Sequence, residues 1–199
     1  MTPAPGGPTL AKAPPMTDSV FHSGIQRLVD AWTALPGASR IPDRAAFDPN
    51  ALGRLLPQVF LAERRDEGLV FRLAGGWIER AHGRPLKGAY VLEVWRRESR
   101  LMVHRGLAQA FREGRPMIFS ADMEMEDGAL LPAEIVAAPL RGPTGLPDRL
   151  LGLYQPLGAE GEEAKDVQGL IVRARTPAAT PPVRRAALTL AAVDGRRIA

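Results

Sequence analysis

The chain has 199 residues, enough for one well-buried domain with tails, and its 45% hydrophobic and 24% charged residues are typical of a globular protein. No run approaches the roughly 18 apolar residues of a membrane helix. There is no cysteine, which excludes disulfides, thiolate metal sites, cysteine nucleophiles and cysteinyl chromophores. We expect a cytoplasmic protein.

The basic residues are concentrated towards the C-terminus, and the sequence pI is about 10.1. From residue 170 onward Asp194 is the only acidic residue, whereas the preceding part of the chain is nearly neutral. This pattern argues against a DNA-binding face on the core. It leaves attachment of a basic extension, residues 159–199, to nucleic acid or an anionic membrane as one hypothesis. The arginines concerned are Arg173, Arg175, Arg184, Arg185, Arg196 and Arg197.

The N-terminal part divides into a tail and a helix. Residues 1–18 are rich in Pro, Gly, Ala and Thr without an apolar period, so we expect them to be disordered. Residues 19–37 have the apolar spacing of an amphipathic helix, with Phe21, Ile25 and Trp32 on its stripe. This stripe either covers the sheet of the domain or pairs with a second subunit, which makes these three residues candidate partner or dimer contacts.

Two short strands follow a connecting helix. Asp48 and Pro49 have the positions of an N-cap and a first helical residue, and Pro57 ends the segment. The β-rich runs "QVFLAERR" and "LVFRLAG" flank "DEG", which suits a hairpin turn. We therefore expect one antiparallel strand pair before residue 75.

The stretch from residue 75 to 114 is irregular at first and then helical. "GWIERAHG" allows a single helical turn, and "RPLKGAYVLEVW" is loop or short helix. A long helix is predicted from about Arg97 to Glu113, ended by Gly114. Its expected apolar face comprises Leu101, His104, Leu107, Ala108 and Phe111.

The rest of the domain has the two-residue period of strands. "MIFSADMEMEDG" and "ALLPAEIVAAPLRG" are joined by an Asp-Gly turn, and "RLLGLYQPLG" follows. Sequential hairpins predict an α+β fold with a five-stranded antiparallel sheet and helices on one face. "LIVRARTP" either adds a strand or belongs to the extension.

This order of elements resembles the PAS sensor domain. The stretches "IPDRAAFDP", "LLPQVFLAE", "FRLAGGWIERAHGRPLKG" and "PLRG" are similar to those of the small single-domain PAS proteins of alphaproteobacteria. The resemblance implies a PAS-like domain over residues 38–158, with a small cavity between the sheet and the helical layer. It also implies regulation of the cell cycle or of polarity through histidine-kinase pathways.

The candidate ligand site is the segment that faces the sheet. Phe71, Trp77, Ile78, Trp95 and His104 are its candidate lining residues, and their bulk either encloses a ligand or simply fills the core. In haem-binding relatives of the fold, the iron ligand lies where His104 lies on the long helix. The alternative for His104 is a hydrogen-bonded core or boundary histidine.

No arrangement of side chains indicates catalysis. Glu124 and Glu126 alternate onto the solvent face of a strand, and no nucleotide loop or catalytic triad is recognisable. We therefore expect a non-enzymatic signalling protein that binds other signalling proteins, histidine kinases among them. The alternative is a sensor of a small molecule such as haem, a fatty acid or a nucleotide alarmone.

Overall fold

The computed structural model describes residues 21–38, 40–158 and 164–178. The predicted tail at residues 1–18 lies outside this range, as does most of the basic extension. The helices, with η for 3-10 segments, are α1 (Ser23–Thr33), η1 (Arg44–Ala46), η2 (Pro49–Gln58), α2 (Gly76–Ala81), η3 (Val91–Val94) and α3 (Arg100–Glu113). The strands are β1 (Val59–Arg65), β2 (Gly68–Ala74), β3 (Met117–Met125), β4 (Leu130–Leu140), β5 (Arg149–Pro156) and β6 (Val167–Pro177).

The strands form one sheet in the order β2-β1-β5-β4-β3-β6, and all neighbouring strands are antiparallel. Both expected hairpins are present. The β3–β4 turn contains Gly128 at φ +83°, a conformation that favours glycine. The α+β prediction is therefore confirmed.

The number of strands is corrected by β6. This strand pairs with β3 along most of its length and makes the sheet six-stranded rather than five-stranded. The sheet therefore continues past residue 158, where the basic extension was expected to begin. Apolar residues such as Leu170 and the pairing with β3 bind this part of the extension to the domain.

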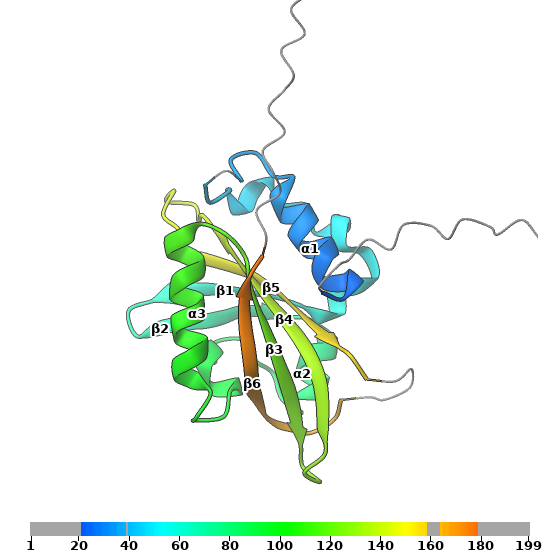
Figure 1. Ribbon diagram of the computed structural model, residues 1–199. Helices are drawn as coiled ribbons and strands as arrows, with labels where there is room; N and C mark the ends of the chain where they lie inside the picture. The colour runs from blue at the N-terminus through cyan, green and yellow to red at the C-terminus, as the bar shows by residue number, and fades with distance from the viewer. Residues whose placement is uncertain (1–20, 39, 159–163, 179–199) are drawn as a thin grey trace, which may run out of the picture.

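Helical elements cover both faces of the sheet, whereas we expected helices on one face. Segments α2, η3 and α3 pack on one face, and α1 with η2 packs on the other (Figure 1). Strand β3 shows both environments, because Met117 and Phe119 belong to the first apolar cluster and Ile118 to the second. The two-residue period of a strand directs these neighbours to opposite faces.

Helix α1 is fixed to the sheet by capping and by close contact. The Nδ1 atom of His22 accepts a hydrogen bond from the backbone N–H of Gly24, which satisfies one donor at the start of the helix. A Cβ atom at Gly24 would overlap the side chain of Gln155 in β5. The indole Nε1 of Trp32 donates to the Pro139 carbonyl in β4 at 2.8 Å. The helix therefore covers the sheet of its own chain.

Helix α3 begins and ends close to the prediction, but its buried face only partly matches the expected one, since Leu107 and Phe111 pack on the core while Leu101, His104 and Ala108 are exposed. Its buried residues are Val103, Gly106, Leu107 and Ala110. A Cβ atom at position 106 would lie 2.6 Å from the ring of Phe119, so the helix needs a small residue there to approach the sheet. The positions of the large apolar residues did not predict the whole buried face, because the helix contacts the sheet partly through small residues.

None of the helices in the described residues is long and apolar enough to cross a membrane.

Gly152 in β5 tests the packing of the sheet face below α2, η3 and α3. Its Cα lies opposite that of Phe60, and a Cβ atom at position 152 would overlap the Phe60 ring. We expect Gly152→Ala to lower the free energy of unfolding by about 1–3 kcal/mol in urea denaturation, since overpacking displaces a buried ring. Phe60→Leu in the same chain should recover part of the loss, and purely additive effects would contradict this explanation.

Candidate functional site

Aromatic side chains fill the space between the sheet and the layer formed by α2, η3 and α3. Phe60 in β1 meets Phe71 in β2 edge to face, with ring centroids 5.4 Å apart, and meets Tyr154 in β5 at 5.8 Å. Trp95, directly after η3, lies 5.7 Å from Phe119 in β3. Edge-to-face pairs of this kind stabilise a packed aromatic core beyond the area that they bury.

The cavity left between these rings has a volume of only about 10 Å³. This is barely the space that one water molecule needs. Haem, a fatty acid or a nucleotide would therefore require several of these rings to move. The lining residues are Phe60, Phe71, Val91, Trp95, Val103, Leu107, Phe119, Ile135, Ala137 and Tyr154.

The structure separates the five candidate ligand residues. Phe71 and Trp95 line the cavity, as expected. Ile78 is buried in the same apolar cluster but does not line the cavity, and Trp77 is half-buried beside a surface groove. His104 is exposed on α3. The expectation that His104 lines the cavity is therefore wrong, because Val103 and Leu107 are the residues that α3 directs into the interior.

The three candidate partner contacts lie against the chain's own sheet. Ile25 and Trp32 are buried between α1 and the strands, and Phe21 is half-buried against the same cluster. Their assignment as contacts with a partner or a second subunit is corrected accordingly. The apolar stripe that motivated it is satisfied within the chain.

An open groove of about 730 Å³ lies between α2 and the segment that precedes β6. Trp77 contributes an aromatic side chain to it, and the charged residues are of both signs. The mixture of Glu79, Arg80, Arg84, Lys165 and Asp166 favours neither anions nor cations.

His82 is a mostly buried titratable group between α2 and the sheet. Its ring lies 6.0 Å from that of Tyr154. Burial, the largest cause, and the nearby charge of Arg84 lower the pKa of His82 to about 4, although a hydrogen bond with the backbone of Val167 partly opposes the shift. The Nε2 atom is buried and has no hydrogen-bond partner within the described residues. The ring is therefore neutral in the folded chain near pH 7.

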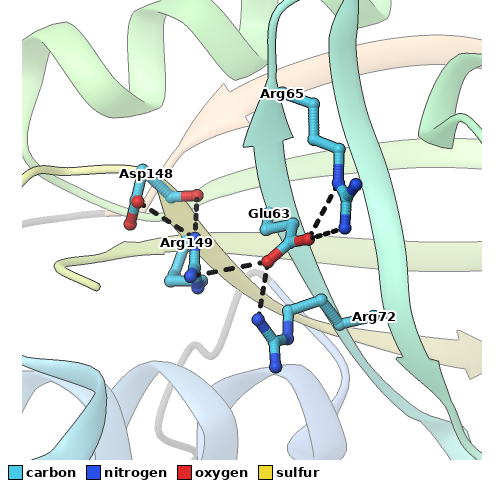
Figure 2. Close-up of polar contacts among 5 residues, drawn as sticks. All are labelled: Glu63, Arg65, Arg72, Asp148 and Arg149. Atoms are coloured by element: carbon cyan, nitrogen blue, oxygen red, sulfur yellow. Dashed lines mark hydrogen bonds and ion pairs between the residues drawn. The ribbon is translucent and has the colours of Figure 1, made fainter. Parts of the chain in front are cut away.

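Glu63 holds three arginines together on the sheet face that α1 partly covers (Figure 2). Its carboxylate accepts hydrogen bonds from Arg65 at 2.6 Å and Arg72 at 2.7 Å, and it lies 3.4 Å from Arg149. Arg149 also pairs with Asp148. Hydrogen bonds from Arg72 and then Arg65 lower the pKa of Glu63, although burial opposes this.

Several of these residues were missed in the sequence, although signals for them exist. The alternation in "QVFLAERR" places Phe60 and Ala62 on one face and Glu63 on the other. Alternation in β5 likewise places Tyr154 on the face opposite to that of its neighbour Leu153. Nothing local, however, indicates that His82 would be buried or that Arg72 and Arg149 would meet at one carboxylate, since strand pairing brings them together.

His82 should make the chain less stable in mild acid. The unfolded chain takes up a proton near pH 6.5, whereas the folded ring resists protonation until about pH 4. The folded chain therefore keeps its full stability with respect to His82 above pH 6.5. It loses stability relative to the unfolded chain as the pH falls from 6.5 towards 4. In urea titrations at several pH values, we expect His82→Asn to flatten this slope, which is at most about 1.4 kcal/mol per pH unit for one proton.

The exposed His104→Asn variant is the control and should leave the slope as in the parent chain. An unchanged slope in His82→Asn would contradict the neutral buried ring.

The Glu63 cluster predicts a second acid effect at lower pH. Because the folded pKa is lowered, the stabilisation is complete above about pH 4.5 and is lost as the pH falls through the folded value. We expect Glu63→Gln to lower the free energy of unfolding at pH 7 by about 1–3 kcal/mol, because the arginines lose their shared acceptor. Arg65 and Arg72 remain largely solvated, which keeps the cost below that of a fully buried pair.

The exposed Glu126→Gln is the matched control, measured by the same denaturation. Equal stability of the two variants would show that the cluster contributes nothing.

Comparisons with known proteins give one family match and several similar solved structures. A family model described as PAS domain matches residues 20–155. Among solved structures, the d2 variant of RsLOV is 21% identical with a TM-score of 0.43, and it covers 55% of this chain. The LOV protein of Rhodobacter sphaeroides is 18% identical with a TM-score of 0.45 over 56% of this chain. The match spans 64% and 65% of the lengths of these two proteins.

The PAS-B domain of Drosophila melanogaster Cycle with bound glycerol is 10% identical, with a TM-score of 0.40, over 49% of this chain and 99% of its own. No curated protein matches the sequence. Since the family model takes in well over half of the residues, the chain belongs to the PAS domain family, whose domains have signalling or sensory roles.

Proposed function

We propose that this PAS domain is a non-enzymatic regulator that acts by binding other proteins. The main support is the closed interior, whose cavity of about 10 Å³ offers no preformed ligand site. At the same time, the large apolar side chains of Leu73, Leu101 and Leu146 are exposed. Interaction sites are marked by contiguous apolar surface, and of these three only Leu101 lies beside a second exposed apolar side chain, that of Met102.

We further propose that the partners are cytoplasmic signalling proteins, histidine kinases in a cell-cycle pathway among them. The basis is the resemblance to small single-domain PAS proteins of alphaproteobacteria. Sensing of haem, a fatty acid or an alarmone ranks second, since the rings of Phe60, Phe71 and Trp95 would first have to separate. Attachment to membranes or nucleic acid through the C-terminal arginines stays a prediction, and two of them, Arg173 and Arg175, lie in β6.

Photo-crosslinking in the native cell tests this proposal. A benzophenone amino acid is placed in the full chain at Leu101, Leu73 or Leu146, where the exposed side chains tolerate replacement. We expect at least one position to capture a signalling protein, identified by mass spectrometry. The position facing the partner should give a stronger crosslink than the others.

Native mass spectrometry of the freshly purified chain is the complementary measurement. We expect the mass of the polypeptide alone, 21.5 kDa. A retained small molecule that disappears in Phe71→Trp, a substitution that enlarges a ring lining the interior, would favour the sensor instead. Crosslinking that captures no signalling protein at any of the three positions would overturn the proposal.

A further inference from the structure

Helix α3 and the edge strand β6 lie side by side (Figure 1), and a groove of about 490 Å³ runs between their side chains. On the helix side, Leu101 is 60% exposed and Met102 is 40% exposed. These two side chains give the groove an apolar wall. The complete lining is Glu98, Leu101, Met102, Arg105, Arg173, Ala174 and Arg175.

The outer edge of β6 is occupied only in its first half. The Leu170 carbonyl accepts from the backbone N–H of Arg96 at 2.9 Å, and the N–H of Val172 donates to the Ser99 hydroxyl at 3.1 Å. Beyond Val172, no hydrogen bond joins the backbone of residues 173–176 to α3 among the described residues. An edge strand with free backbone groups is a template for one more strand.

The charges around the groove are mainly positive. Arg173 pairs with Asp122 and Arg175 donates to Gln109, so both guanidinium groups are held in place. Arg105 has no ion pair within the part of the chain that the structure describes. Asp122 offsets the charge of Arg173, which leaves Arg105 and Arg175 against the one carboxylate of the groove lining, that of Glu98. Such a field attracts acidic partners and repels basic ones.

We propose that the α3–β6 groove binds an acidic, extended segment of a partner protein, which adds to the outer edge of β6. Backbone hydrogen bonds to the outward-facing groups of residues 173–176, above all the N–H and C=O of Arg175, supply part of the affinity, because strand addition uses the main chain. Alternate side chains of the added strand lie on one face, so apolar ones contact Leu101 and Met102 while acidic ones face the arginines. This inference rests on the proposed function and specifies its contact surface.

Fluorescence anisotropy with the full chain tests the groove. The probe is a fluorescein-labelled peptide of about nine residues that alternates valine and glutamate, the length of an ordinary strand. Its controls are a valine–lysine peptide and the same acidic peptide with alternate amides N-methylated. We expect the acidic probe to bind, the lysine probe not to bind, and N-methylation on the edge that faces β6 to abolish binding.

Matched variants localise the contact. Arg105→Glu and Leu101→Ser should each weaken binding about ten-fold, the effect of removing one good contact. Arg112→Glu makes the same charge change on the same helix outside the groove, and Leu130→Ser removes an exposed leucine elsewhere, so both should bind like the parent chain. All four positions are exposed, and circular dichroism checks that the variants fold.

Absence of binding by the acidic probe, or equal binding by the groove and control variants, would overturn the groove assignment. Equal binding of the lysine probe or of the N-methylated probe would do the same. If the crosslinking experiment captures signalling proteins while the probe fails, the proposed function stands and only its contact surface is wrong. If crosslinking captures none, the proposed function fails whatever the peptide does.

Discussion

Burial of the sheet on both faces is the constraint on which the rest of the structure depends. Strand β4 is buried along almost its whole length, because α3 lies above one face and α1 above the other. Two helical layers can approach so closely only where side chains are small, as at Gly24 and Gly106. Among the described residues, most apolar side chains of the sheet are therefore buried. Exposed apolar groups remain on α3 and in some loops and strands.

The segment around Trp95 connects the aromatic interior to the outer edge of β6. Trp95 packs on Phe119 inside, while its backbone pairs with Leu170 of β6. The following residues, Arg96 and Ser99, occupy the first half of the outer edge of that strand. The groove between α3 and β6 therefore lies next to the segment that carries Trp95.

The ligand residues expected from the sequence were correct only where the local pattern decides orientation. Phe71 lines the interior because strand alternation fixes its face. The expectation for His104 was wrong because the face that α3 buries depends on how the helix lies on the sheet. Gly106 and Ala110 allow a close approach that the larger residues do not indicate. Glu63 with its arginines was not predictable, because strand pairing gathers residues from β1, β2 and β5. His82 was missed since burial is a property of the assembled core.

The sequence by itself determined the α+β class, the order of elements, both hairpins and the ends of α3, because these follow from local periods, turn residues and caps. It also identified the PAS resemblance. Tertiary structure alone decided that β6 joins the sheet, that the apolar stripe of α1 covers it, and that the interior is nearly full. Each of these depends on contacts between residues far apart in the chain, such as Trp32 with Pro139 and β3 with β6. No local pattern encodes which distant surface an apolar stripe will meet.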